Sequence, residues 1–175
     1  MTEFGIRDAA PDDAAAIASI YEPYVRTTCV TFEEIPPSPA EIASRMQQIR
    51  ERGLPFHVAE KAQGVIGYAY AAPFHPRSAY RYAVEDSVYV ERSHAGQGIG
   101  TALMQRLIEE CAALGYRQMI ALIGDQENQA SIRLHARLGF RQIGILSGVG
   151  LKLGRWVDVT EMQLALGDGA QTIPS

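Results

Sequence analysis

The sequence predicts a single domain of the α/β (α+β) class. Two neighbouring segments, 55–60 and 65–72, are rich in β-branched and aromatic residues and are separated by the turn Lys-Ala-Gln-Gly, which favours an antiparallel hairpin. Further on, a strand at 80–90, a helix at 99–114 and an apolar strand at 118–124 form a strand-helix-strand unit. A chain of 175 residues with 47% hydrophobic content is enough for one domain with a sizeable core.

The first elements are a short strand at 4–9 and a helix that follows Asp12, which we expect to cap it. The segment 27–38 after this helix is predicted to be a loop. The apolar stripe of the helix is formed by Ile17, Ile20, Tyr21 and Tyr24.

A second helix has a stronger start signal. Ser38 as N-cap, Pro39 at the first helical position and Glu41 at the third form a capping box, and Gly53 marks the end. The apolar stripe of this helix consists of Ile42, Met46 and Ile49.

The connection at 73–79 contains two prolines and is predicted to be irregular, with side chains that can face a ligand. The helix that begins at Ile99 is predicted to end at Gly115. Its core side is formed by Ile99, Leu103, Leu107, Cys111 and Leu114.

The last part of the chain is predicted to add a helix at 128–138 and strands at 140–146 and 156–166. The sequence contains no internal repeat or linker. We therefore expect residues 1–166 to form one domain and residues 167–175 to be a disordered tail.

Charge and cysteine content narrow the possible partners. The formal net charge of −4 offers no basic surplus for nucleic acid or an anionic membrane, and no apolar run approaches a membrane span. Two cysteines are too few for a disulfide framework, and the first 30 residues carry Asp8, Asp12 and Asp13 in place of a basic leader. We expect a cytoplasmic protein without nucleic-acid or membrane partners.

Glycines alternate just before the helix at Ile99, in the order Gly96, Gly98 and Gly100. Such a loop lets backbone amides approach a phosphate at the positive end of a helix. A P-loop is excluded, because no Gly-Lys-Ser/Thr follows, and a Rossmann fingerprint is disfavoured by the G-x-G-x-G spacing. A flexible connection that binds nothing remains the alternative, and for a lone glycine cluster we weigh the two about equally.

Four stretches together resemble the GNAT acetyltransferase superfamily. They are EDSVYV at 85–90, GQGIG at 96–100, NQASIRLH followed by LGF at 128–140, and LGRWVDVTEMQL at 153–164. The region from Gly67 to Leu164 is similar to the branch that N-acetylates phosphinothricin, methionine sulfoximine and methionine sulfone. The resemblance implies a GNAT fold, with a central mixed, mostly antiparallel twisted sheet and helices on both faces.

The resemblance also implies acetyl-CoA as cosubstrate and direct transfer within a ternary complex. The loop Gly96, Gln97, Gly98, Ile99, Gly100 and Thr101 would receive the pyrophosphate, and the strand edge Val88, Tyr89 and Val90 would hold the pantetheine arm and the thioester carbonyl. Asn128 and Ser131 would contact the cofactor from the following helix. Ala95 departs from the family's usual Gln or Arg, so we expect weaker or redistributed side-chain contacts to phosphate.

Two residues are candidates for proton transfer. The family match places a general base at Glu85, although an acidic pair such as Glu85 and Asp86 can equally have one member facing water. His135 stands where the superfamily often has a tyrosine that protonates the leaving thiolate. A satisfied or surface histidine is the alternative, and we weigh the two about equally.

For the amino-acid substrate, Arg77 matches an arginine of the phosphinothricin-acetylating branch and could bind a carboxylate, although a solvated loop arginine is the commoner case. Tyr80 and Phe74 could wall the pocket. The predicted substrate site comprises Phe74, His75, Pro76, Arg77, Tyr80, Glu85, Asp86 and Ser87.

The sequence thus predicts an N-acetyltransferase that uses acetyl-CoA and no metal, acts on the α-amine of a small amino-acid analogue, and forms a homodimer. The alternatives are a non-catalytic acyl-CoA-binding or sensing module on the same fold, and a GNAT enzyme for another small amine.

Overall fold

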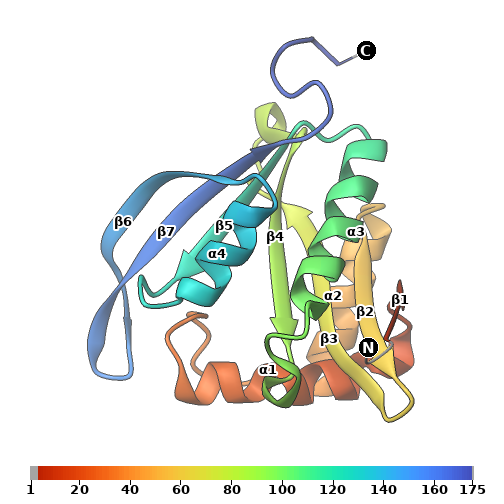
Figure 1. The fold of residues 1–175 in the computed structure, drawn as a ribbon, viewed down its shortest axis with the longest axis vertical. Coiled ribbons are helices and arrows are strands. Elements are labelled where there is room, and N and C mark those ends of the chain that lie inside the picture. Colours follow the sequence, from red (N-terminus) through yellow and green to blue (C-terminus); the bar gives the residue numbers. More distant parts are fainter. Residues whose placement is uncertain (1–3, 175) are drawn as a thin grey trace.

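A seven-stranded sheet forms the centre of the protein, which we describe from a computed structural model for residues 4–174 (Figure 1). The strand order is β1-β2-β3-β4-β5-β7-β6, and among the described residues β4 and β5 are the one parallel pair. The predicted mixed, mostly antiparallel sheet is therefore confirmed. The strands are β1 (Gly5–Asp8), β2 (Phe56–Lys61), β3 (Gly64–Pro73), β4 (Ala83–Val90), β5 (Gln118–Gly124), β6 (Arg141–Lys152) and β7 (Arg155–Ala165).

Helices cover both faces of the sheet, as predicted. Helices α1 (Ala14–Thr27) and α2 (Pro39–Glu51) pack on one face, and α3 (Ile99–Ala113) and α4 (Gln129–Arg137) pack on the other. Alternation along the strands divides the buried side chains between these two layers. On β2, for example, Val58 packs with α1 and α2, whereas Ala59 packs with α3.

The two N-terminal helices begin in different ways. At α2 the predicted capping box is present: the hydroxyl of Ser38 accepts from the Glu41 amide at 3.2 Å, and Glu41 Oε2 accepts from the Ser38 amide at 2.7 Å. The prediction that Asp12 caps α1 is wrong. A short 3-10 turn precedes α1, and Asp13 accepts from the Ala10 amide at 2.7 Å and from the Arg7 guanidinium.

Helix α3 buries Ile99, Leu103, Leu107 and Cys111 as predicted, but Leu114 is half exposed. The helix ends at Ala113, Leu114 is its C-cap residue, and the left-handed Gly115 follows as the chain leaves the helix.

In the segment predicted to be a disordered tail, residues 167–170 form a turn and residues 171–172 a bend. There Arg117 donates hydrogen bonds to the carbonyl oxygen of Gly169 at 3.3 Å and to the hydroxyl of Thr172 at 3.0 Å. No helix within residues 4–174 is long and apolar enough to cross a membrane.

Candidate active site

A groove opens where β4 and β5 diverge. These strands pair only over Ala83–Glu85 and Gln118–Ile120, and beyond that point β4 stays with β3 while β5 stays with β7 (Figure 1). The groove between them has a volume of about 930 Å³. The early end of the parallel pairing therefore exposes one edge of β4 to a potential ligand.

Most residues predicted to bind the cofactor line this groove. They are Val88, Tyr89, Val90, Gly96, Gly98, Ile99, Gly100, Thr101, Asn128 and Ser131. Gln97 lies outside the groove, where its side-chain oxygen accepts a hydrogen bond from Lys61 Nζ at 2.9 Å. Ala95 also lines the groove, so the departure from the family pattern falls at the ligand-facing surface.

The three loop glycines have two different roles. Gly96 and Gly98 have φ of +76° and +82°, and among the described residues no atom lies within 4 Å of a Cβ added at either position. A Cβ at Gly100, in contrast, would lie 2.9 Å from Leu134 Cδ1. Gly96 and Gly98 therefore allow the turn and leave space in front of it, whereas Gly100 allows α3 to pack closely against α4.

The start of α3 directs free amides into the groove. The first backbone bond of the helix runs from the Ala102 amide to the carbonyl of Gly98 at 3.0 Å. The amides of the preceding helical residues point out of the helix end, where the helix dipole is positive. This arrangement suits a phosphate or pyrophosphate.

Asn128 also serves the fold. Its side-chain oxygen accepts from the Ser131 amide at 3.3 Å and caps α4. The amide nitrogen of the same side chain remains available on the groove surface, because the cap uses only the oxygen.

Glu85 lies on β4 opposite Ala72 of β3 and lines the groove. Burial raises the pKa of its carboxyl, and the neighbouring charge of Asp86 adds to the effect. Among residues 4–174, no lysine, arginine or histidine forms an ion pair with it. A carboxylate with a raised pKa and no cationic partner is suited to accept a proton near neutral pH.

Asp86 points to the opposite face of the sheet and binds His135. Its Oδ2 lies 2.9 Å from His135 Nε2, and His135 Nδ1 donates to the carbonyl of Ser131 at 2.8 Å. Both side chains of the pair are almost completely buried. Because a carbonyl can only accept, Nδ1 carries a proton, and the pair ties α4 to β4.

This geometry counts against two predicted roles. Both ring nitrogens of His135 are bonded within the protein, so neither is free to protonate a thiolate. Burial alone lowers the pKa of His135, but the hydrogen bond and charge of Asp86 and the Ser131 carbonyl together raise it above its usual value. Asp86, predicted as a substrate residue, uses Oδ2 for the histidine, and among the described residues its buried Oδ1 has no hydrogen-bond partner.

The predicted substrate loop lies away from the groove. Phe74, His75 and Tyr80 form a cluster of edge-to-face and tilted rings, with the Phe74 and Tyr80 centroids 5.7 Å apart, and Arg77 is exposed. Pro73 ends β3, and a 3-10 turn follows at Ser78–Tyr80. Within one chain, the structure thus brings Glu85, Asp86 and Ser87 to the groove, and His135 lines it beside Asp86. The remaining predicted substrate residues do not line it: Phe74, His75, Pro76, Arg77 and Tyr80.

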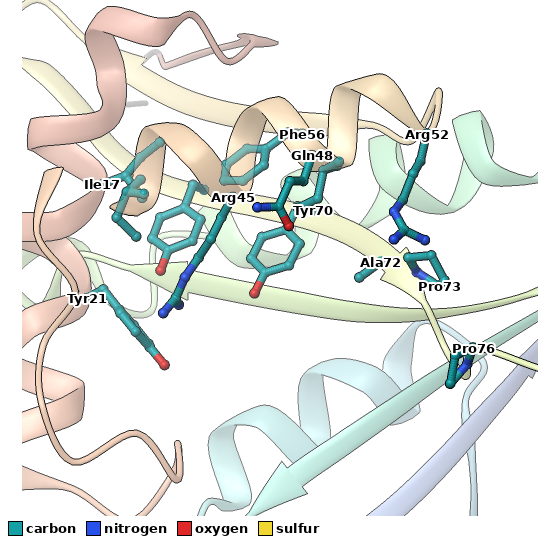
Figure 2. Close-up of a pocket in the computed structure, with 13 residues that line it drawn as sticks. Ile17, Tyr21, Arg45, Gln48, Arg52, Phe56, Tyr70, Ala72, Pro73 and Pro76 are labelled. Carbon is teal, nitrogen blue, oxygen red and sulfur yellow. The ribbon is translucent and has the colours of Figure 1, made fainter. Parts of the chain in front are cut away.

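A second cavity, of about 370 Å³, adjoins the groove on the face of α1 and α2. Tyr21 and Tyr70 line both spaces, and Figure 2 shows the Arg45 guanidinium lying between their rings. Arg45 binds Glu33 through two hydrogen bonds of 2.6 and 3.0 Å, and Tyr21 donates to Glu33 at 3.1 Å. Two residues of the predicted connection at 73–79, Pro73 and Pro76, line this cavity.

Sequence reasoning missed Arg45, Glu33 and Tyr70. Tyr21 was predicted as a core position of α1, and Glu33 lies in a segment predicted only as a loop. The helical period places Arg45 on α2, but nothing local indicates that its side chain reaches across to the loop.

Comparisons with known proteins agree with this geometry. Residues 16–140 match the model of the acetyltransferase (GNAT) family. A phosphinothricin N-acetyltransferase of Alcaligenes faecalis is 46% identical over 97% of this chain and 86% of the relative. An L-methionine sulfoximine/L-methionine sulfone acetyltransferase of Pseudomonas aeruginosa is 42% identical over 92% of this chain and 94% of the relative.

A solved structure has the same sequence identity to this chain as the Alcaligenes faecalis protein. It is a GNAT superfamily phosphinothricin acetyltransferase from Sinorhizobium meliloti in complex with AcCoA, 46% identical, with a TM-score of 0.95 over 100% of this chain and 94% of that one. The fold and the groove thus define an acetyltransferase of the GNAT type. The chain belongs to the GNAT acetyltransferase family, and its relatives include the phosphinothricin and methionine sulfoximine branch that the sequence predicts.

Proposed function

We propose that the protein transfers the acetyl group of acetyl-CoA to the α-amine of a small amino-acid analogue of the phosphinothricin, methionine sulfone or methionine sulfoximine type. The observation that carries this proposal is the groove between β4 and β5. It joins the glycine loop at the start of α3 to the half-buried carboxylate of Glu85. The names of the relatives and the AcCoA complex of the Sinorhizobium meliloti protein support the same substrates.

The groove offers surfaces suited to successive parts of acetyl-CoA. The space in front of Gly96 and Gly98 and the free amides of α3 suit the pyrophosphate. The exposed edge of β4 from Val88 to Val90 suits the extended pantetheine arm, which can pair with backbone groups as a further strand does. The thioester then lies toward Glu85.

Acetyl transfer needs a free amine and a route for two protons. Glu85 takes one proton from the substrate ammonium, directly or through a water, and the amine attacks the thioester carbonyl carbon. The C–N bond forms, the C–S bond breaks, and the sulfur leaves with the electron pair of that bond. The second proton passes from nitrogen to the thiolate, so that the products are an amide and a thiol. His135 acts in this scheme as a positioning residue that holds α4 against β4.

The second cavity, which adjoins the groove at Tyr21 and Tyr70, suits the side chain of the substrate. Tyr21 and Tyr70 supply its walls, and Arg45 supplies a guanidinium for a carboxylate or another anionic group of the substrate. Glu33 holds this guanidinium in place through two hydrogen bonds. In one chain Arg45 therefore occupies the role that the sequence assigned to Arg77.

A thiol-release assay tests the proposal. With acetyl-CoA present, methionine sulfone, methionine sulfoximine or phosphinothricin should release CoA much faster than a polyamine, an aminoglycoside or a histone-like peptide. Preferential reaction with a polyamine would contradict the substrate class. Acetyl-CoA binding without thiol release for any amine would favour a non-catalytic acyl-CoA-binding module.

We also propose that the protein forms a homodimer through the β6–β7 hairpin. This hairpin forms one edge of the sheet, and its far end extends beyond α4 (Figure 1). It exposes an unusual number of large apolar side chains, which is typical of an interaction surface. They are Ile143, Ile145, Leu146, Val149, Leu151, Leu153 and Trp156.

Light scattering coupled to size exclusion tests this assembly. The parental protein should have the mass of two chains, and the double variant Leu151→Glu/Trp156→Glu should have the mass of one. A parental monomer would contradict the proposal.

The two free, buried cysteines, Cys29 and Cys111, fit a reducing compartment, and we accordingly propose a cytoplasmic location.

A further inference from the structure

We propose that Asp8, His57 and Glu110 form a binding site for a divalent transition-metal ion such as Zn²⁺, separate from the acetyl-transfer groove. None of the three residues lines the groove or the adjoining aromatic cavity. Their positions in the chain are far apart, and the sequence accordingly predicts no metal site. The fold brings one side chain from each of β1, β2 and α3 together.

The sheet register explains how the three side chains meet. Asp8 of β1 and His57 of β2 are directly opposite each other in the antiparallel ladder, so their side chains point to the same face. That face is the one covered by α3, because Ala59, two residues after His57, packs in the α3 layer. Glu110 lies on α3 and reaches down to the histidine ring.

The environment of His57 is unusual. Its side chain is 1% exposed, and within residues 4–174 neither Nδ1 nor Nε2 has a hydrogen-bond partner. Buried polar groups are normally satisfied, because an unpaired one costs free energy. Asp8 Oδ1 lies 3.1 Å from Nδ1, and Glu110 Oε2 lies 3.0 Å from Nε2, but neither oxygen is aligned for a hydrogen bond.

The two carboxylates lie at different nitrogens of the ring, so a single ion would bind one ring nitrogen and the carboxylate beside it, and the other carboxylate would rotate to reach the ion. Zn²⁺ binds nitrogen and oxygen ligands at about 2.0–2.2 Å in a tetrahedron, which places neighbouring ligand atoms roughly 3.3 Å apart. The three candidate ligand atoms all lie within 4.8 Å of one another. One ring nitrogen and two carboxylate oxygens then leave a fourth position for water.

The accessibility and charge of the cluster also suit a cation. The Asp8 side chain is 78% exposed and that of Glu110 is 36% exposed, so an ion can enter from solvent and both carboxylates can adjust. Two arginines lie near the cluster of Asp8, His57 and Glu110. Arg106 Nε is 3.6 Å from Glu110 Oε2, and Arg7 is turned away toward Asp13 and Glu60. Arg106 is therefore the competitor of the metal for Glu110.

The mixed ligand set predicts which metal binds. Imidazole with carboxylates suits Zn²⁺ and other first-row ions, whereas Mg²⁺ prefers oxygen ligands only and keeps its waters. After treatment with EDTA and buffer exchange, the full-length protein should bind one Zn²⁺ per chain in equilibrium dialysis at pH 7.5. Added Zn²⁺ should raise the melting temperature, and Mg²⁺ at the same concentration should not.

Substitutions test whether each of the three residues contributes to Zn²⁺ binding. His57→Gln should weaken Zn²⁺ binding about 100-fold or more, and Asp8→Asn and Glu110→Gln should each weaken it at least about 10-fold. Arg106→Met should strengthen binding because it removes the competing cation. The two carboxylate variants alter partly or largely exposed side chains, so they keep the test valid if His57→Gln does not fold.

His94→Gln is the matched control. His94 Nδ1 lies 3.0 Å from Glu91 Oε2 in another histidine–glutamate pair, and its replacement should leave Zn²⁺ binding unchanged. Absence of stoichiometric Zn²⁺ binding would overturn the proposal. So would equal binding by the parental protein and the Asp8→Asn and Glu110→Gln variants, or loss of binding in His94→Gln alone.

Discussion

Glu85 and Asp86 are neighbours on β4, but their carboxylates lie on opposite faces of the sheet. Glu85 lines the groove without a cationic partner among the described residues, whereas Asp86 is buried against His135. Identical chemical groups therefore have different tasks. A carboxylate kept free of cations can take up and release a proton, and one that is locked in a buried pair contributes to stability.

The largest expected effect comes from removing the free carboxylate. Glu85→Gln should lower kcat/KM by about 10²–10⁴ at pH 7, because the ammonium substrate loses its base. The loss should shrink at high pH, where the amine is already deprotonated. Steady-state kinetics across pH with one good acceptor measures both effects.

The affinity for acetyl-CoA is the control for Glu85→Gln and should stay close to the parental value. The free energy of unfolding should also change little, because the carboxylate has no partner to lose. Parental kcat/KM at pH 7 would end the assignment of Glu85 as the base.

Removing the locked carboxylate should instead affect stability. Asp86→Ala should lower the free energy of unfolding by about 3–5 kcal/mol, because it leaves a buried imidazole unpaired. Asp86→Asn is the conservative control and should cost less, since its amide can still hydrogen-bond a neutral ring. Urea unfolding measures both variants, and equal losses for Asp86→Ala and Glu85→Ala would contradict the distinction between the two faces.

The pair should also give stability a defined pH dependence. The pKa of His135 is raised in the folded protein above its ordinary value of 6.5, so its contribution is fully present below about pH 6.5. That contribution is lost as pH rises through the folded-state pKa. The stability difference between the parental protein and Asp86→Ala should therefore be larger at pH 6 than at pH 9. A difference that grows with pH would have the wrong sign.

The smallest effect is expected from the hydroxyl beside the same histidine. Ser131 Oγ lies 3.3 Å from His135 Nδ1, but the Ser131 carbonyl is closer, at 2.8 Å. Ser131→Ala keeps that carbonyl and should change the free energy of unfolding by no more than about 0.5 kcal/mol. A loss comparable to that of Asp86→Ala would show that the hydroxyl, not the backbone, orients the ring.

Local signals explain much of what the sequence predicted correctly. Ser38 and Glu41 are three residues apart, and the hairpin of β2 and β3 depends on a short turn. Interactions over such distances are decided by neighbouring residues. The prediction for Asp12 failed because the adjacent Asp13 is held by Arg7, a residue of β1.

The substrate site shows the limit of such reasoning. The resemblance indicates Arg77 as the residue that binds the substrate carboxylate. Within one chain, however, Arg77 is exposed, and Arg45 lines the aromatic cavity instead. For His135, sequence left a catalytic and a satisfied histidine equally open. The contact with Asp86, 49 residues earlier in the chain, favours the satisfied one.

The sequence by itself determined the family, the order of elements, the glycine loop and the proton-accepting candidate Glu85, because these depend on local pattern and motif. The tertiary structure decided which side chains meet: Asp86 with His135, Arg45 with Glu33, and His57 with Asp8 and Glu110. The physical reason is that alternation places neighbours such as Glu85 and Asp86 on opposite faces, while register and helix packing select their partners from distant parts of the chain.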